Sequence, residues 1–329
     1  MNSTLDWRPS DQHRRLLATI VGTQPNREAM ATWNRDVDFE SLDSASCELL
    51  ALLSRQRSDD VPLGDAPDRS VANLTDNGTL RGFRRRAFYI NTRALGRIES
   101  ALAALDSQGV RTVLAGGLAA IGHYPDLSCR ALPDCEILVA AADVDRALSV
   151  IQRLGWSVAP NGRVSIDGCP EGFAIVSRLR GIEQGTVLDV DQLAVENCSV
   201  TGTSRRALAR SVMVVEVSVA AVWPGTNPPV RWVVDLHYLL SDADGTVAIV
   251  RHASRHSAAQ LTRTALTEAR SCGVTGISKG LLARLAWTHS STAERAAVLD
   301  RALCSNLDFI KGRTTAAVRS EERRVGKEC

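Results

Sequence analysis

The chain has 329 residues, of which 44% are hydrophobic and 23% are charged. This is the composition of a globular protein long enough for two or three packed units, and it excludes disorder for most of the chain. The 39 basic residues nearly balance the 37 acidic ones, so the formal net charge is only +2. A strongly basic surface for phosphate backbones is therefore absent, and a nucleic-acid partner is not expected.

Almost all of the basic residues are arginines, because only Lys279, Lys311 and Lys327 are lysines. Such a bias is typical of a GC-rich bacterial genome. The composition changes abruptly in the segment RSEERRVGKEC, residues 319–329, whose back-translation resembles a sequencing adapter joined in frame. We leave this tail out of the fold prediction, as a fusion scar would be, and treat the length as a lower limit.

The cysteines and the N-terminus indicate a cytoplasmic protein. The eight cysteines contain no CxxC pair, which favours reduced thiols. The first 15 residues carry charges where a secretory signal needs an apolar core. The longest apolar run, 212–223, is interrupted by Glu216, so neither a signal peptide nor a membrane span is predicted.

The N-terminal third predicts helices. Apolar residues recur at helical spacing in residues 10–56, and again over 88–108. Between them, residues 57–77 are rich in Asp, Pro, Ser and Gly, which indicates an exposed linker. Gly109 follows the second helical stretch at the position of a left-handed C-terminal cap.

Six arginines lie between Arg81 and Arg97, and no acidic residue occurs among them before Glu99. One interpretation is a solvated helix face, which is the usual role of such a charge run. The other is a rim that attracts the phosphates of a nucleotide.

The middle of the chain predicts short strands and helices around a Gly-Gly turn. In chain order, the expected elements are a strand at 110–115, a turn at Gly116 and Gly117, a short helix at 118–124, a strand at 134–140 and a helix at 142–154. From 156 to 240 β-branched residues dominate and a sheet is expected, with strands at 187–190, 212–222 and 230–236. Helical spacing returns over 257–270 and 280–303.

Two acids occupy the second predicted strand. Asp134 and Glu136 are one residue apart, so both carboxylates are expected on one face, about 6.6 Å apart along the strand. Neighbouring acids repel unless a divalent cation, an arginine cluster or bulk water lies beside them. A solvated sheet edge is the structural interpretation, and a pair of Mg²⁺ ions is the functional one.

A third acid, Asp235, lies in the run RWVVDLHYLL, which predicts a buried strand. A charge in such a strand is costly unless it is paired or bound to a metal. If this strand lies beside that of Asp134, its carboxylate can take the proton of an attacking hydroxyl or help to hold the metal. His237 would share its face, as a functional or a structural histidine. The alternatives for the third acid, all in β-like runs, are Asp189, Asp191 and Glu216.

The Gly116-Gly117 turn lies between a predicted strand and a predicted helix. Without side chains, the backbone can approach phosphate oxygens, and a following helix start adds free N–H groups. A simple tight turn is the alternative. Neither a GxGxxG dinucleotide fingerprint nor a P-loop is present.

Taken in order, these motifs resemble the polymerase-beta-type nucleotidyltransferases: a glycine turn after a short strand, a D-x-[DE] strand and a later aspartate between apolar residues. More narrowly, the chain resembles a poorly characterised bacterial branch whose members read LKGxAL, YPD, RPxGDxDLLV, LGY and VDLHW. The matching segments here are WNRDVDFESL (33–42), Asn91, LAGGLAAIGHYPD (114–126), RALPDCEILV (130–139), LGW (154–156) and VDLHY (234–238).

The resemblance implies an α/β (α+β) fold, with a nucleotidyltransferase-like mixed β-sheet flanked by helices, an N-terminal helical region and C-terminal helices. The expected division is a helical region and linker at 1–78, a nucleotidyltransferase-like core at 79–245, a C-terminal helical region at 246–318 and the non-native tail at 319–329.

By the same resemblance, Asp134 and Glu136 match the two metal-binding acids and Asp235 matches the third. The residues that match the nucleotide-binding positions are Gly116, Gly117 and Arg130. The implied function is transfer of a nucleoside monophosphate from a nucleoside triphosphate to a hydroxyl of an unknown small-molecule or protein acceptor. Mg²⁺ or Mn²⁺ is the implied cofactor, and pyrophosphate is the second product.

Three residues depart from the family pattern, and the serine usual after the glycine is also absent. Glu136 replaces an aspartate, Pro133 replaces a glycine, and Ala115 or Gly116 stands where a lysine is usual. The departures favour the alternative hypothesis, a catalytically degenerate relative that binds or scaffolds. Metal hydrolysis by His252 and His256 is a third idea, but it lacks an HExxH glutamate and a nearby third ligand.

Overall fold

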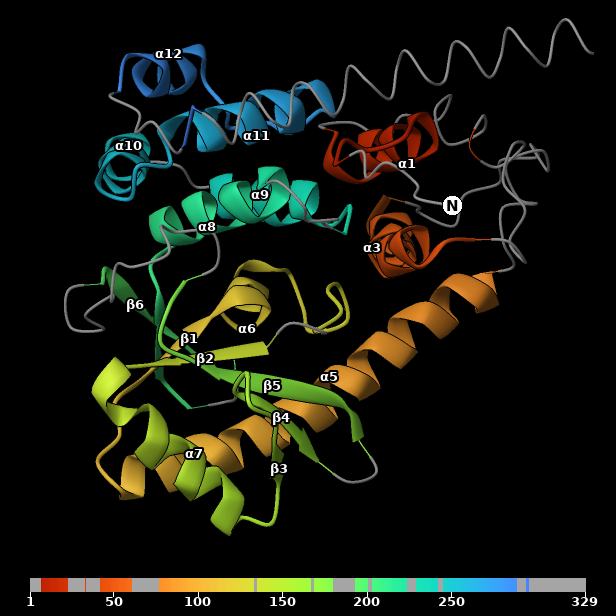
Figure 1. Ribbon diagram of the computed structural model, residues 1–329. Coiled ribbons are helices and arrows are strands. Elements are labelled where there is room, and N and C mark those ends of the chain that lie inside the picture. The colour runs from red at the N-terminus through yellow and green to blue at the C-terminus, as the bar shows by residue number, and fades with distance from the viewer. Residues whose placement is uncertain are drawn as a thin grey trace, which may run out of the picture.

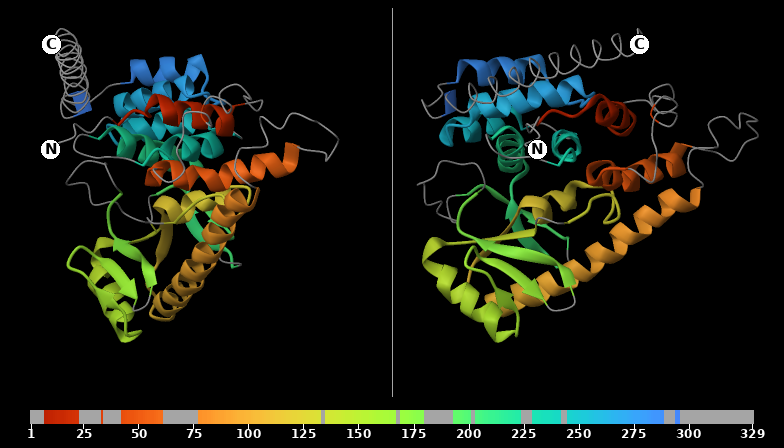
Figure 2. Two further views of the ribbon diagram at one scale, coloured as in Figure 1. Left: turned by 90° about the vertical axis from the view of Figure 1, so that its right-hand side faces the viewer. Right: turned by 45° about the vertical axis from the view of Figure 1, so that its right-hand side comes forward.

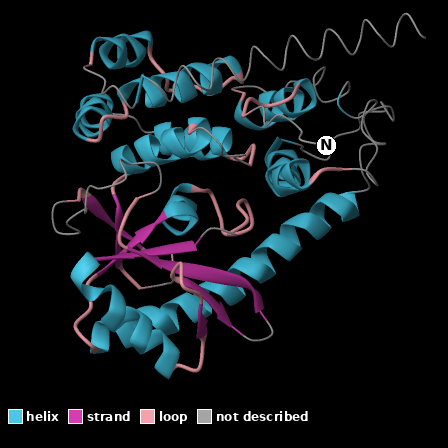
Figure 3. Cartoon of the chain, in the orientation of Figure 1, coloured by secondary structure: helices cyan, strands magenta, loops and turns pink. Residues whose placement is uncertain are grey.

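The structure, a computed structural model, describes residues 7–22, 33, 42–60, 77–132, 135–166, 169–179, 193–200, 203–223, 229–241, 245–288 and 294–295. They form a mixed α/β fold in which helices cover a central sheet (Figures 1 and 3). The predicted fold class, a mixed sheet flanked by helices with further helices at both ends of the chain, is confirmed.

The described strands form a seven-stranded sheet in the order β3-β4-β5-β2-β1-β7-β6. Their bounds are β1 Thr112–Ala115, β2 Cys135–Val139, β3 Ser157–Val158, β4 Arg163–Ile166, β5 Cys169–Val176, β6 Val195–Cys198 and β7 Arg205–Leu208. The central strands β1 and β2 are antiparallel to each other, whereas β5 and β7 run parallel to the strands they flank. The strands predicted at 110–115 and 134–140 are therefore confirmed as β1 and β2.

Helices lie on both sides of this sheet, and the same layers are visible in both views of Figure 2. Those on one side are α5 Asn77–Ser107 and α7 Val144–Arg153, the latter preceded by the 3-10 turn η3 Ala141–Asp143. Those on the other side are α6 Gly116–Ala120, η2 Ile121–His123, α8 Arg210–Val222 and α9 Trp232–Leu240. Beyond them lie α1 Asp11–Val21, α10 Thr246–Arg255, α11 Ala259–Ser271 and α12 Lys279–Trp287, while α3 Ser44–Asp60 lies beside them, between α1 and one end of α5.

Two segments predicted as strands are helices. Residues 212–222 lie in α8, and most of 230–236 lies in α9. Both helices lie between the sheet and the outer helices, most of their side chains are buried and none is fully exposed. A helix buried all round has no polar face to reveal its period, so its β-branched run looks like a strand. The predicted strand 187–190 lies outside the described residues.

The helix predicted over 88–108 is longer than expected, because α5 begins at Asn77 and has 31 residues. Its end is the predicted glycine cap. Gly109 has φ +67°, its N–H bonds the carbonyl of Asp106 at 2.9 Å, and the N–H of Val110 bonds the carbonyl of Leu105 at 3.0 Å. This pair of bonds is the Schellman motif, and it turns the chain directly into β1.

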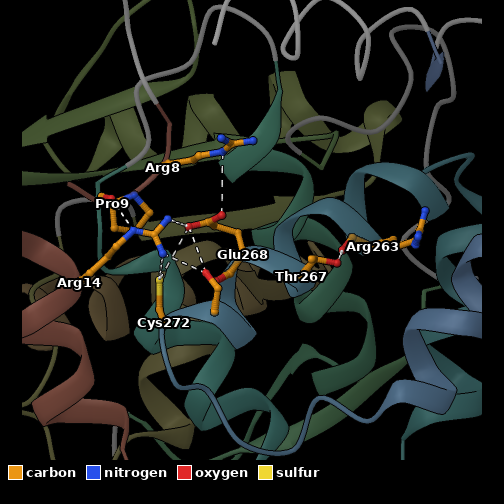
Figure 4. Close-up of polar contacts among 8 residues, drawn as sticks. Arg8, Pro9, Arg14, Arg263, Thr267, Glu268 and Cys272 are labelled. Atoms are coloured by element: carbon orange, nitrogen blue, oxygen red, sulfur yellow. Dashed lines mark hydrogen bonds and ion pairs between the residues drawn. The ribbon is translucent and has the colours of Figure 1, made fainter. Parts of the chain in front are cut away.

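The two ends of the described chain pack together. Arg14 in α1 donates to the carboxylate of Glu268 in α11 and, at 3.0 Å, to the hydroxyl of Ser271 (Figure 4). Arg8 approaches the other oxygen of Glu268 at 3.9 Å. Buried apolar side chains extend as one cluster from α1 through the sheet to α12. Within the described ranges, no helix has both the length and the apolar content needed to cross a bilayer.

Candidate functional site

The glycine turn lies where the two central strands meet. β1 ends at Ala115, and Gly116, with φ +55°, turns the chain into α6. The backbone of Gly116 also pairs with Cys135 at the start of β2. A positive φ is costly for a residue with a Cβ, so this turn favours glycine. The predicted strand-turn-helix order is confirmed.

Glu136 lies directly beside this turn. In the sheet register it is the partner of Ala115 on β1 and of Ala174 on β5. Paired residues on neighbouring strands project to the same face, so the Glu136 carboxylate has two methyl groups as its cross-strand neighbours. The residue is buried, with 3% of its surface exposed. Asp134, its predicted partner, lies outside the described residues.

Asp235 is not on a strand, and this corrects the predicted site. It lies in the first turn of α9 and is 4% exposed. Successive residues of a helix are about 100° apart, so Asp235 and His237 project to nearly opposite sides instead of sharing a face. The prediction that Asp235 lies on a strand next to that of Asp134 and Glu136 is therefore wrong. Among the alternatives, Glu216 lies on α8, and Asp189 and Asp191 lie outside the described residues.

Asp235 forms a buried, bidentate ion pair with Arg130. The guanidinium donates from Nε to Oδ1 at 2.8 Å and from Nη2 to Oδ2 at 3.0 Å. The Arg130 side chain is 3% exposed and that of Asp235 is 5% exposed. The Tyr124 hydroxyl donates a further hydrogen bond to Oδ1 at 2.6 Å. Burial, with the nearby Asp235 charge, raises the pKa of Tyr124 well above its ordinary value, so the hydroxyl keeps its proton and remains a donor.

The same face of α9 also holds the Tyr124 ring. Tyr238 is three residues after Asp235, and its ring centroid lies 4.4 Å from that of Tyr124. The ring of His237 lies 5.0 Å from that of Tyr238, and burial lowers the pKa of this histidine. The Tyr124 hydroxyl thus bonds Asp235 and its ring packs against Tyr238, while His237 takes no part in the ion pair.

A buried asparagine on α5 holds the backbone next to Arg130. The side-chain amide of Asn91 donates to the carbonyl of Leu127 at 2.5 Å and to the carbonyl of Arg130 at 2.6 Å. Asn91 is fully buried. Residues 124–132, here named the entry loop, lead into β2, and Asn91 supplies donors that this loop cannot provide for itself.

Arg84 holds the same entry loop two helical turns before Asn91. It donates to the hydroxyl of Ser128 and to the carboxylate of Asp126, both at 2.9 Å. Burial raises the pKa of Asp126, but the hydrogen bonds from Ser128 and the charge of Arg84 outweigh it and bring the pKa below its ordinary value. The entry loop is therefore held between α5 and α9.

The arginine-rich stretch divides between two roles. Arg84 binds the entry loop, whereas Arg85 and Arg86 are exposed. Next to them, Phe88 and Tyr89 are 52% and 61% exposed. The guanidinium of Arg93 lies 5.5 Å from the centroid of the Tyr89 ring. Exposure fits the solvated-face interpretation for part of the stretch. A role toward phosphates remains a prediction.

In the described part of the chain, no three His, Cys, Asp or Glu side chains converge as metal ligands. His252 lies on α10 and His256 directly follows it as the C-cap, with their rings nearly parallel and 6.4 Å apart. Burial lowers the pKa of both rings, and neighbouring arginines lower it further. Among the described residues, no third metal ligand lies beside these two histidines, so the structure gives the hydrolase hypothesis no support.

Sequence reasoning missed the contacts that hold the entry loop. Tyr124, Asn91 and Tyr238 belong to the matched motifs and Arg84 to the arginine-rich stretch, but no contact among them was predicted, and Ser128 carried no recognisable pattern. Their roles depend on α5 and α9 meeting one loop from two sides, which no local spacing reveals. The single available signal was Asp235 itself, a charge inside an apolar run that requires a partner.

No family model and no curated protein matches the chain. Two solved structures are similar to it. The antibiotic-resistance factor ANT(2'')-Ia has 15% sequence identity, covering 52% of this chain and 96% of that one, with a TM-score of 0.40. An antigenic nucleotidyltransferase-like protein from Paracoccidioides brasiliensis has 12% identity, covering 59% of this chain and 93% of that one, with a TM-score of 0.37.

Proposed function

We propose that the chain is a metal-dependent nucleotidyltransferase. The observation that carries this proposal is the register of β1 and β2, because it places the Glu136 carboxylate beside the Gly116-Gly117 turn. A nucleotidyl transfer needs acidic oxygens for a cation and a backbone that phosphates can approach, side by side. The ordered motifs that resemble this superfamily supply the same assignment.

In the proposed reaction, an acceptor hydroxyl attacks the α-phosphorus of a nucleoside triphosphate. A new acceptor-oxygen to phosphorus bond forms, the bond to the bridging oxygen of the β-phosphate breaks, and pyrophosphate leaves. The hydroxyl proton passes to solvent or to a nearby carboxylate. The acceptor is a small molecule or a protein side chain.

Glu136 and Asp134 are the proposed ligands of Mg²⁺ or Mn²⁺. Carboxylate oxygens are the donors these cations prefer, and β2 fixes the position of Glu136. When bound, the cation supplies neutralisation of the triphosphate charge and polarisation of the reacting oxygens. Glu136 carries one more methylene than the usual aspartate, and the alanines paired with it on both sides add no bulk there.

Gly116 and Gly117 are the proposed phosphate-binding turn. A Cβ at either position would narrow the approach of a phosphate to the backbone, and the positive φ of Gly116 already disfavours one. We propose that Gly116 and Gly117 have two roles: they form the tight turn between β1 and α6, and their backbone binds the outer phosphates.

A direct assay tests the proposal. The purified chain is incubated with each α-labelled nucleoside triphosphate and Mg²⁺ or Mn²⁺, with a broad set of hydroxyl acceptors and with the protein itself as acceptor. We expect label transfer and stoichiometric pyrophosphate, both abolished by EDTA. Absence of transfer and of pyrophosphate release for all four nucleotides contradicts the proposal.

The alternative function is nucleotide binding without transfer, which the Glu136, Pro133 and Ala115 departures favour. Calorimetry separates the two functions. A degenerate site binds nucleotide without Mg²⁺, and Glu136→Gln leaves that affinity unchanged. An active site binds the Mg²⁺ complex, and Glu136→Gln weakens that binding.

A further inference from the structure

Both oxygens of Asp235 are already occupied. Oδ1 accepts hydrogen bonds from Arg130 Nε and from the Tyr124 hydroxyl, and Oδ2 accepts one from Arg130 Nη2. To bind a metal ion, the Asp235 carboxylate would have to give up its hydrogen bonds with the Arg130 guanidinium. That loss would leave the Arg130 charge, whose side chain is 3% exposed, without its carboxylate.

Physical chemistry makes that loss unfavourable. Removing one partner of a buried ion pair is strongly destabilising, because the remaining charge can neither hydrate nor pair. The third donor of Arg130, Nη1, bonds the carbonyl of Ala131 at 3.1 Å, which ties the guanidinium to its own backbone as well. Each of the three guanidinium nitrogens of Arg130 thus donates a hydrogen bond, and together these bonds hold the group in one place.

We infer that Asp235 is a positioning residue: through Arg130 and Tyr124 it holds the entry loop against α9, and so sets where the chain enters β2 and presents Glu136. This replaces the metal-ligand role that its place among apolar residues suggested. Arg130, on the same grounds, is a support of the loop and not a free phosphate ligand. The ion pair joins residues 105 positions apart, so it is a purely tertiary device.

The inference rests on the proposed function only for the Mn²⁺-binding measurements described below. Loop order is measured separately by hydrogen-deuterium exchange on the free protein. The variant Asp235→Asn keeps the shape of the side chain but removes its charge. We expect the backbone amides of 124–132 and 135–139 to exchange at least about tenfold faster.

A matched control removes a different aspartate from an ion pair. Asp143 binds Arg146 at 2.6 Å, three residues away, and the arginine is half-exposed. Such surface pairs contribute little to stability, so Asp143→Asn should leave exchange of the entry loop unchanged. Equal exchange of the entry loop in Asp235→Asn and Asp143→Asn overturns the inference.

The decisive variant removes both charges. The double variant Arg130→Met/Asp235→Leu is made in the Tyr124→Phe background, so that neither a buried charge nor the Tyr124 hydroxyl is left without a partner, and apolar replacement of a buried pair is often neutral. We expect exchange of the loop to return to within about threefold of the original protein. We also expect Mn²⁺ binding, followed by electron paramagnetic resonance, to recover relative to Asp235→Asn.

A metal ligand gives the opposite pattern. If Asp235 binds the cation, the double variant loses Mn²⁺ as completely as Asp235→Asn does, and the entry loop stays ordered in both. Should Asp235→Asn fail to fold, Tyr124→Phe removes one hydrogen bond only. Unchanged loop exchange in that variant also overturns the inference. Failure of the original protein to bind Mn²⁺ or to transfer label contradicts the proposed function, while the exchange results still test the positioning role.

Discussion

The Asp235 carboxylate and the Arg130 guanidinium form two parallel hydrogen bonds of 2.8 and 3.0 Å in the interior of the protein. This pair connects α9 to the loop that leads into β2. Asn91 and Arg84 hold the other side of the same loop from α5. The candidate site is therefore supported by two helices, α5 and α9, to which neither of the proposed metal ligands belongs.

Asn91 should be the most sensitive of these supports. Asn91→Leu keeps the branching of the side chain but leaves two carbonyls without their donor, that of Leu127 in a part-buried place and that of Arg130 in a buried one. Each unsatisfied group costs roughly 1–3 kcal/mol, so the variant should lose about 2–4 kcal/mol of unfolding free energy. Chemical denaturation measures this loss. The neighbouring Thr92 is exposed, and Thr92→Ala should change stability by less than about 0.5 kcal/mol; equal effects of the two variants contradict the account.

Gly116 should not tolerate a side chain. Its φ of +55° makes Gly116→Ala unfavourable by roughly 1–2 kcal/mol. Gly82 is the matched control, because it lies on the exposed face of α5 and a Cβ there meets nothing within 4 Å. Gly82→Ala should stabilise the helix by about 0.5–1 kcal/mol. Thermal unfolding of the two variants should therefore shift in opposite directions, and a Gly116→Ala variant that is as stable as Gly82→Ala would show that the turn is not strained by a Cβ.

The paired histidines at the C-terminal end of α10 predict a pH dependence of stability. Burial, His252 and Arg255 lower the pKa of His256 from 6.5 to about 4. Above pH 6.5 the ring is neutral in both states, and its contribution to unfolding is constant. As the pH falls from 6.5 toward 4, the unfolded chain takes up a proton that the folded chain excludes, so stability decreases. His256→Gln should make stability less dependent on pH in this window, as measured by denaturation at a series of pH values, and Ser254→Ala should not.

The sequence was informative where an element has a local cause. The glycine cap after α5, the turn at Gly116 and the two central strands all follow from residue type and spacing, and all are present in the structure. The strand prediction for 230–236 was wrong because periodicity disappears in a helix that is buried on every side. Because of this error Asp235 was expected on a strand, whereas it lies in the first turn of α9.

The site was predictable only in part, for the same reason. The register of β1 with β2 brings Glu136 to the glycine turn, as the order of the motifs suggested. The partner of a buried charge, in contrast, comes from wherever the fold places a complementary group. Arg130 could be picked out from the resemblance, but nothing in its local sequence shows that its guanidinium faces Asp235.

The proposed function depends most directly on the Glu136 carboxylate, and one comparison tests it. Release of pyrophosphate is measured for the original protein, for Glu136→Asp and for Glu136→Gln with saturating nucleotide and Mg²⁺. Loss of a partner outside the metal ligands alone costs roughly 10–100-fold, so removal of a ligand charge in Glu136→Gln should reduce the rate by at least about 100-fold. Glu136→Asp should retain activity, because it keeps the charge and has the residue usual in the nucleotidyltransferase motif that this strand resembles. Equal rates for Glu136→Gln and the original protein contradict the account.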